Sequence, residues 1–280
     1  MKSSIKILSL VFSLFMLSCT DVIDVEVPEA PPRLVIEASM DWQKGTLGNS
    51  QTVKLSLSTP YFDNLLETPV SGASVKVINN ENQTEVVFTD QNNGNYTTNN
   101  FEPVMGDSYT LLVNYEGDRY IATETMTSVS PISDVYQSTE NGFSKDALEV
   151  NIEFFDPAGI ENFYLAKFQR RGDKFQTLFD VKDEFTDGNK MSIFYEKLEN
   201  EETGEMEFQP GDIVDIELLG LSDPYYNYIK LLIEQSQSGG PFSTIPAEIK
   251  GNCINQTSPE NYAFGYFRVS EVDKRVYVFE

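Results

Sequence analysis

The chain has 280 residues, of which 40% are hydrophobic and 12% aromatic, enough for a packed core in one large domain or two small ones. It carries 44 acidic against 20 basic residues and a net charge of −24, so its surface repels polyanions and we expect no nucleic-acid partner. It contains no histidine, which excludes Ser-His-Asp and Cys-His nucleophiles and histidine-based zinc or iron sites. Carboxylate-only chemistry such as glycoside hydrolysis stays open, although no spacing in the sequence marks a pair of acids for it.

Residues 1–18 have the pattern of a secretory signal peptide, with a short cationic start and an apolar run from residue 7 to residue 17. This run is shorter than the about 20 apolar residues that a transmembrane helix needs. It ends at Met16-Leu17-Ser18-Cys19, which has the form of a lipobox, so we expect Cys19 to become the lipid-bearing first residue of the mature chain. The alternative is a buried or incidental cysteine in an ordinary cleaved signal or in a membrane anchor. The remaining cysteine, Cys253, then has no partner, and we expect a small semi-buried residue and no disulfide framework.

Residues 19–32 follow as a polar, extended segment that we interpret as a tether. It contains four acids and three prolines: Asp21, Asp24, Glu26, Glu29, Pro28, Pro31 and Pro32. Loss of residues 1–18 removes two lysines and no acid, which lowers the net charge from −24 to −26, so acyl chains on Cys19 are the expected attachment to the lipid bilayer. Acids close behind a lipidated cysteine resemble the signals that send some Bacteroidetes lipoproteins to the cell surface. We therefore expect an outer-membrane location, with the periplasmic face as the alternative to the cell surface.

From residue 33 the pattern is that of β-structure, with period-two alternation bounded by turn residues. The expected strands cover residues 34–38, 53–58, 73–78, 85–89, 96–97, 108–115 and 119–125. Seven short strands in this span are typical of an immunoglobulin-like β-sandwich, which we predict over residues 33–128.

A connection that contains Pro131 leads into a second β-rich domain, which we predict over residues 129–280 with one or two helices. Its expected strands cover residues 148–155, 162–170, 192–198 and 212–219, followed by a closing pair at 264–269 and 275–279. The clearest helix lies near residues 223–237, because Ser222 or Asp223 can cap it and Pro224 suits its first position. The predicted fold class is therefore mainly β.

Two acidic clusters are candidates for a metal site: Asp180, Asp183, Glu184 and Asp187, and then Glu199, Glu201, Glu202, Glu205 and Glu207. Calcium prefers oxygen ligands and suits an exported acidic protein. However, residues 183–189 lack the alternating acids and the terminal glutamate of an EF-hand loop, so we favour a solvated hairpin. We expect no cofactor and no metal ligands, with calcium as the weaker interpretation.

Aromatic residues offer two further candidates for ligand contact. Tyr225, Tyr226 and Tyr228 could form a stacking platform for a sugar or a peptide, but their helical spacing favours Tyr225 and Tyr228 in the core and Tyr226 exposed. Trp42, the single tryptophan, lies beside a glycine-containing polar loop and would be a contact residue if it were exposed.

Several short motifs, in their order and spacing, resemble domain-of-unknown-function family 4249 over most of residues 33–269. They include Leu34-Val35-Ile36-Glu37, Thr59-Pro60-Tyr61-Phe62, Phe154-Phe155-Asp156-Pro157, Tyr226-Asn227-Tyr228, Pro241-Phe242-Ser243, Gly251-Asn252 and Gly265-Tyr266-Phe267. Members of that family look like Bacteroidetes outer-membrane lipoproteins encoded beside TonB-dependent receptors. The resemblance implies an accessory subunit in nutrient uptake and brings no catalytic residue with it.

The sequence therefore predicts a non-enzymatic outer-membrane lipoprotein, anchored through Cys19, that acts as an accessory or substrate-capturing subunit of a TonB-dependent outer-membrane receptor. The first alternative is a surface adhesin or structural module, because immunoglobulin-like domains on tethers often serve that purpose. The second is a carboxylate-dependent hydrolase, which would require two acids that converge in a cleft. The sequence identifies no catalytic residue and leaves the ligand-binding residues unknown.

Overall fold

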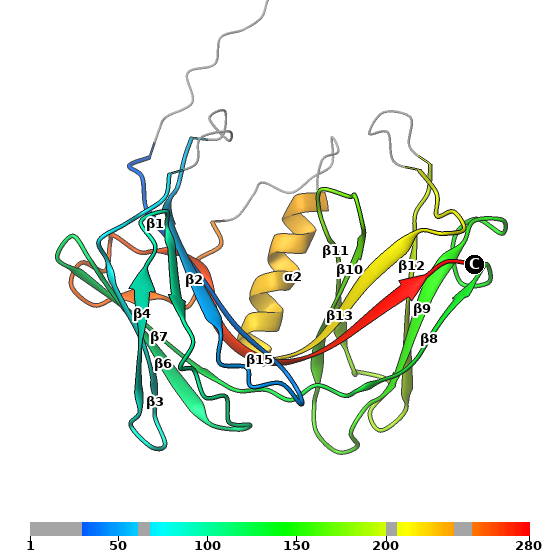
Figure 1. Cartoon of the computed structure of the whole chain (residues 1–280), viewed down its shortest axis with the longest axis horizontal. Helices are drawn as coiled ribbons and strands as arrows, with labels where there is room; N and C mark the ends of the chain where they lie inside the picture. The colour runs from blue at the N-terminus through cyan, green and yellow to red at the C-terminus, as the bar shows by residue number, and fades with distance from the viewer. Residues whose placement is uncertain (1–29, 61–67, 200–205, 238–247) are drawn as a thin grey trace, which may run out of the picture. The chain divides into compact units, whose positions relative to one another are not determined.

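The computed structural model describes residues 30–60, 68–199, 206–237 and 248–280, and Pro32–Glu280 forms one compact unit (Figure 1). The signal peptide, Cys19 and most of the tether lie outside the described residues, so lipidation stays a prediction. No helix in the described ranges is long and apolar enough to cross a membrane. The described chain is mainly β with one α-helix, which confirms the predicted fold class.

The N-terminal half forms a first β-sandwich whose two sheets share one strand. One sheet contains β1 (Leu34–Gln43), β2 (Gln51–Leu57) and β5 (Asn95–Thr98), and the other contains β3 (Ser74–Asn79), β6 (Ser108–Tyr115), β7 (Asp118–Thr125) and β14 (Ile254–Asn255). Strand β4 (Glu85–Asp90) pairs with β3 through its first four residues and with β5 through its last two. It therefore crosses from one sheet to the other, and the immunoglobulin-like β-sandwich predicted for this half is confirmed.

Period-two alternation places one face of each strand in the first core. In β1, every second residue from Leu34 to Met40 is buried and the residues between them are half-buried or exposed. Tyr96 of β5 is also buried, and its hydroxyl accepts the N–H of Ala73 at 3.1 Å and donates to the carbonyl of Val70 at 3.0 Å. The polar end of this tyrosine is satisfied, so its ring can occupy the core without an unpaired hydroxyl.

The second half forms a second β-sandwich. Its three-stranded sheet has the order β12 (Lys190–Glu196), β9 (Glu149–Phe155), β8 (Ile132–Ser138), and the facing sheet has the order β11 (Thr177–Lys182), β10 (Phe163–Arg170), β13 (Ile213–Leu221), β15 (Phe264–Val278). Aromatic and branched side chains such as Ile152, Phe168 and Ile216 fill the core between the sheets. The sequence pattern does not predict β8 and β11, because most of their residues are half-buried or exposed and show no alternation.

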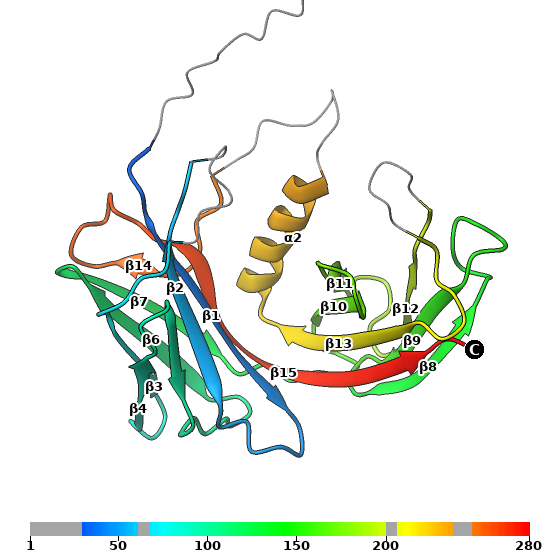
Figure 2. The ribbon, with the colours of Figure 1, turned by 45° about the horizontal axis from the view of Figure 1, so that its top comes forward.

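Strand β15 belongs to both sandwiches, as Figures 1 and 2 show by its red ribbon between β1 and β13. It pairs in parallel with β1 through residues 264–272 and antiparallel with β13 through residues 272–278, which makes one continuous sheet of twelve strands. The expected closing pair of strands is therefore wrong. Polar residues at its centre resemble a turn, but Ser270 and Glu271 are buried, and Glu271 accepts the backbone N–H of Val129 at 3.0 Å. The predicted boundary at residue 128 consequently does not coincide with a break in the sheet.

Helix α2 (Asp223–Gln237) covers the outer face of β10, β13 and β15, and Figure 2 shows it standing on that face. It begins where the Ser222 hydroxyl accepts the N–H of Tyr225 at 3.3 Å. The expectation that Tyr226 is exposed is wrong: it is 8% exposed, because its ring packs on Phe163 at 4.9 Å between centroids. Tyr228 is half-buried, and its ring lies 4.8 Å from that of Tyr266. The three helix tyrosines therefore pack on the sheet.

A buried ion pair ties β1 to β15 beneath the helix. Arg268, 3% exposed, binds both carboxylate oxygens of Asp41, with Nη1 to Oδ1 at 2.5 Å and Nη2 to Oδ2 at 3.1 Å. Burial alone would raise the pKa of Asp41, but the charge and hydrogen bonds of Arg268 outweigh burial and hold this pKa below its ordinary value. The pair stabilises the junction through which the first sandwich continues into the second.

Candidate functional site

The acidic segment interpreted as a weak calcium candidate meets a carboxylate that the sequence does not place beside it. Oxygens of Asp183 and Asp187 and one oxygen of Asp156, which follows β9, all lie within 4.8 Å of one another. Each carboxylate accepts a hydrogen bond that joins the two loops: Asp156 from the Gly188 N–H at 3.2 Å, Asp183 from the Asn162 N–H at 2.9 Å and Asp187 from the Gly159 N–H at 2.7 Å. Such oxygens could hold a hard cation. Asp156 is 5% exposed and Asp183 is 3% exposed, so the expectation of a solvated hairpin is wrong for Asp183, and only Asp187 of the three lies exposed.

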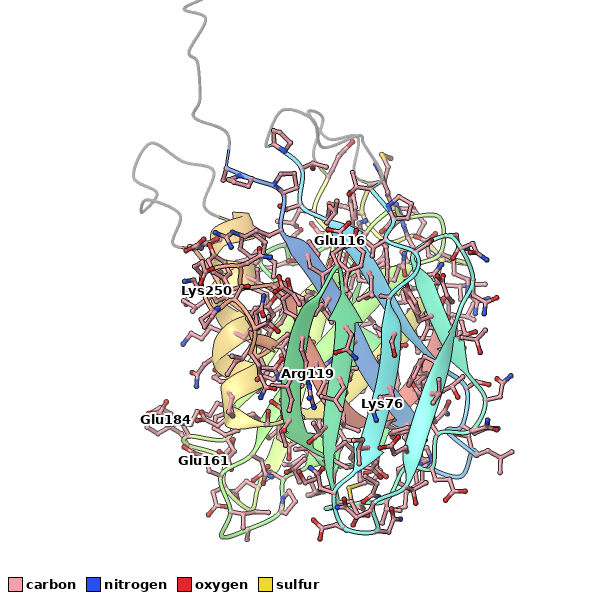
Figure 3. All side chains as sticks on the ribbon, turned by 90° about the vertical axis from the view of Figure 1, so that its left-hand side faces the viewer. Lys76, Glu116, Arg119, Glu161, Glu184 and Lys250 are labelled. Carbon is pink, nitrogen blue, oxygen red and sulfur yellow. The ribbon has the colours of Figure 1, made fainter. Side chains whose placement is uncertain are left out.

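The other acids of the two predicted clusters lie elsewhere. Glu184 does not join the three aspartates; it projects outward from its loop, as does Glu161 (Figure 3). Asp180 lies half-buried in β11. In the second cluster Glu201, Glu202 and Glu205 fall outside the described residues, and Glu199 borders the cleft described below.

Two further residues singled out in the sequence are parts of the first core. Trp42 is half-buried against that core, and its indole N–H donates to the carbonyl of Thr46 at 3.1 Å. Cys253 is 3% exposed, and burial raises the pKa of its thiol to about 12, so the thiol stays protonated and unreactive at neutral pH. Neither residue presents a contact surface.

The two long sides of the second sandwich differ. On one side, hydrogen bonds join β8 to the end of β15: the N–H of Ile132 donates to Asp273 at 2.7 Å, and Arg275 donates to the carbonyl of Ile132 at 2.9 Å. On the other side, β11 and β12 are the last strands of their sheets in the described part of the chain. There the hydroxyls of Thr177 and Tyr195 meet at 3.0 Å. This second side is the open side of the sandwich.

A cleft of about 660 Å³ lies on this open side, and we refer to it as the edge cleft. Its lining residues are Phe143, Thr177, Phe179, Phe194, Tyr195, Glu196, Lys197, Leu198 and Glu199. Six of them, residues 194–199, are consecutive where β12 ends at Glu196, and neighbouring side chains of a strand point to opposite faces of its sheet. The edge cleft therefore lies at the edge and end of this strand, where side chains from both faces border it.

The loop that carries Phe143 is held in place by two carboxylates. Glu149 is fully buried and accepts the backbone N–H groups of Glu140 at 3.2 Å and Asn141 at 2.9 Å. Glu196 accepts the N–H groups of Phe143 at 2.7 Å and Ser144 at 3.0 Å. With its backbone fixed in this way, the loop presents the Phe143 ring 89% exposed to solvent at the rim of the edge cleft.

Gly142 makes this close approach of loop and strand feasible. A Cβ at this position would fall 2.5 Å from the carboxylate of Glu196, so a larger residue would require this carboxylate to shift away from the loop.

The floor of the edge cleft is aromatic. Phe179 of β11 and Tyr195 of β12 have ring centroids 6.1 Å apart, and Phe168 lies beneath them at 5.7 Å from Phe179 and 5.4 Å from Tyr195. Leu198 adds an apolar side chain that is 44% exposed. The edge cleft thus combines aromatic and aliphatic side chains with the polar residues Thr177, Glu196, Lys197 and Glu199.

The charges around the edge cleft leave an acidic surplus. The ammonium of Lys197, 6% exposed, is 2.5 Å from Asp173. Burial opposes ionisation of Asp173, but hydrogen bonds from Lys197 and Arg170 lower its pKa. Arg170, which shares Asp173 with Lys197, also lies 3.5 Å from Asp212. Glu196 and Glu199 then remain as negative charges in the lining, and Glu196 already accepts two backbone N–H groups. The arrangement favours binding of neutral or cationic groups.

Sequence reasoning missed the edge cleft because its walls come from three separate segments. Phe143 carries no local signal of its own, because single exposed apolar residues are normal on a protein surface and Phe175 and Phe185 are also exposed.

Among solved structures, the chain is similar to a two-domain fibronectin type-III segment of chicken tenascin, at 10% identity and a TM-score of 0.22, over 68% of this chain and 91% of that one. It is also similar to the FN1–FN3 domains of chicken CNTN1, at 12% identity and a TM-score of 0.27, over 71% of this chain and 65% of that one. No curated protein matches its sequence. A family model described as a domain of unknown function, DUF4249, matches residues 20–275. The chain therefore belongs to the DUF4249 family, as its sequence motifs indicated.

Proposed function

We propose that this protein is a non-enzymatic, lipid-anchored binding subunit of the outer membrane that acts beside a TonB-dependent receptor. The observation that carries the proposal is the edge cleft, which offers an exposed Phe143 on a hydrogen-bonded loop and an aromatic floor. Its carboxylate Glu196 is occupied by two backbone N–H groups, so it is poorly suited to serve as a catalytic acid or base. These are the properties of a surface that holds a partner or a nutrient.

The attachment to the membrane is expected through lipid on Cys19. A mature chain with a charge near that of the full chain, −24, is repelled by anionic headgroups, so acyl chains are needed to keep it at the bilayer. The acids that follow Cys19 favour the cell surface over the periplasmic face. The receptor as partner is what the family resemblance implies, and the role of accessory or substrate-capturing subunit follows from it.

Affinity isolation from detergent-solubilised outer membranes tests the proposal. A C-terminally tagged chain should recover a TonB-dependent barrel, identified by mass spectrometry, in amounts comparable to its own. The matched control is a tagged, unrelated lipoprotein from the same membranes. Repeated recovery of the tagged chain alone, or of a matrix component without a barrel, would replace the proposal with the adhesin alternative.

A further inference from the structure

We propose that a calcium ion binds where the loop between β9 and β10 meets the loop between β11 and β12. We refer to the five side chains that would hold it as the loop-junction site: Asp156, Asn162, Asp183, Thr186 and Asp187. This site lies where β12 begins, at Lys190, whereas the edge cleft lies where the same strand ends, about 20 Å further along. The inference is therefore independent of the binding role proposed for the edge cleft.

The three carboxylates of the loop-junction site carry a negative charge that no basic side chain balances. Their oxygens lie within 4.8 Å of one another, and Asp156 and Asp183 are only 5% and 3% exposed. In the described part of the chain none of the three forms an ion pair, and the neighbouring Lys182 and Lys190 pair with other glutamates at 2.7 and 2.8 Å. Buried carboxylates at this spacing repel one another, and proteins pair such charges or use them to bind a metal ion.

Two neutral oxygens in the same loops indicate a ligand independently of the carboxylates. Asn162 Oδ1 and Thr186 Oγ1 are buried and have no hydrogen-bond partner among the residues that the structure describes. Each residue as a whole is half-buried, so its oxygen is turned away from solvent and into the protein. A buried oxygen without a partner is unfavourable, and an ion that coordinates it removes this cost.

Backbone hydrogen bonds bring both neutral oxygens to the carboxylates. The N–H of Asn162 donates to Asp183 Oδ2 at 2.9 Å, and the N–H of Thr186 donates to the carbonyl of Asp183 at 2.8 Å. The side-chain oxygen of an asparagine or a threonine lies within about 4 Å of its own backbone nitrogen, so each falls within roughly 7 Å of an Asp183 oxygen. The five groups therefore converge on one place.

The donor set favours calcium over magnesium. Calcium takes six to eight oxygen ligands from carboxylates, amide carbonyls and water in a flexible geometry. Magnesium keeps several of its waters and usually binds only one or two carboxylates. The loop-junction site offers three carboxylates and two neutral oxygens before any water is added, which matches the larger ion.

Isothermal titration calorimetry with calcium chloride tests the proposal on the full chain, purified in detergent and stripped of metal with EDTA. At a salt concentration of about 0.15 M we expect one calcium ion per chain, with a dissociation constant between about 10⁻⁵ and 10⁻³ M. Magnesium chloride should bind at least about ten-fold more weakly. Calcium at about 100 times its dissociation constant should raise the melting temperature by about 5 to 10 °C, because the ion binds the folded chain alone.

A pair of exposed acids in one loop connects the binding to the loop-junction site. Asp187 is exposed, so Asp187→Asn should leave folding intact, and loss of one ligand charge should weaken calcium binding by about ten-fold or more. Glu184→Gln is the matched control, because it removes the same charge from an outward-facing side chain of the same loop that does not join the three aspartates (Figure 3). It should leave the affinity for calcium unchanged.

Thr186→Val distinguishes a ligand oxygen from a structural one. It replaces the unpartnered hydroxyl with a methyl group of similar size. Without calcium the melting temperature should stay equal or rise, since no hydrogen bond is lost. With calcium the affinity should fall by about three-fold to ten-fold, because one ligand is removed.

Three results would overturn the inference. Absence of saturable calcium binding up to about 10 mM, beyond the weakest sites of exported proteins, would show that hydrogen bonds alone hold the two loops together. Weak binding of several ions per chain, equal in wild type, Asp187→Asn and Glu184→Gln, would reveal unspecific attraction to an acidic surface. Equal affinities for calcium and magnesium would contradict the choice of ion. These measurements involve neither the edge cleft nor a receptor, so a failed barrel isolation would leave them intact.

Discussion

The substitution Gly265→Ala tests the close parallel pairing of β15 with β1. Gly265 has a φ of +86° and pairs with Ile36 of β1, and a Cβ there would fall 2.2 Å from the carbonyl oxygen of Ile36. Gly117, in the hairpin between β6 and β7, has nearly the same φ, +87°, but a Cβ there would meet nothing within 4 Å. Gly117→Ala therefore carries the conformational cost alone, and Gly265→Ala carries the same cost together with a backbone clash.

The left-handed conformation costs a non-glycine residue about 1–2 kcal/mol, which is the destabilisation expected for Gly117→Ala. Relief of the clash at Gly265 requires β1 and β15 to separate locally, with loss of about two backbone hydrogen bonds at roughly 1 kcal/mol each. We expect Gly265→Ala to lower the free energy of unfolding by about 3–4 kcal/mol. Urea unfolding measures both variants, with Trp42 fluorescence reporting on the first sandwich and far-ultraviolet circular dichroism on all strands. Equal losses in the two variants would refute the close pairing at Gly265.

Four further substitutions or reactions have defined outcomes. Arg268→Met should lower the free energy of unfolding by about 3 kcal/mol at pH 7, because it breaks the buried pair with Asp41. The pKa of Asp41 is lowered in the fold, so the stabilisation by this pair is lost as the pH falls. The difference in unfolding free energy between wild type and variant should therefore shrink below about pH 4. Burial raises the pKa of Glu124, because it disfavours the charged carboxylate. The contribution of Glu124 to stability is therefore complete at low pH and is lost as the pH rises through its folded pKa. Glu124→Gln should raise the free energy of unfolding more at pH 7 than at pH 4, as measured by urea titration. Cys253 should react with Ellman's reagent at pH 8 in urea but not in the native state, and rapid native labelling would contradict its burial. Cys19→Ser should move the protein from the membrane fraction to the soluble fraction, and unchanged sedimentation would argue against lipidation.

Strands with clear alternation could be predicted from the sequence, whereas strands without it could not. The alternation in β2 and β12 reflects one buried and one more exposed face, which a period-two pattern records. All six residues of β11 are half-buried, so no such pattern distinguishes it from a loop. In β15 the polar residues at the junction resemble a turn, since the sequence cannot show that Val129 satisfies Glu271.

The candidate site depends on contacts between distant segments. Asp156 joins Asp183 and Asp187 only because the end of β9 meets the loop after β11, so the fold keeps two acids of the predicted four-residue cluster and adds a distant third. The edge cleft likewise requires the Phe143 loop to meet the end of β12 through Glu196. Composition, in contrast, directs the search to acidic and aromatic side chains, because the chain contains no histidine.

The most direct test of the central claim combines the barrel isolation with the cleft variant. Tagged wild-type, Phe143→Ser and Val87→Ser chains are expressed at equal levels and isolated from solubilised outer membranes, and the co-isolated TonB-dependent receptor is quantified by mass spectrometry. Val87, 66% exposed on the first sandwich, is the matched control position. If the edge cleft is the binding surface of an accessory subunit, wild type and Val87→Ser will recover equal amounts of receptor and Phe143→Ser about ten-fold less. Equal recovery by all three chains, or no receptor with any of them, would contradict the claim.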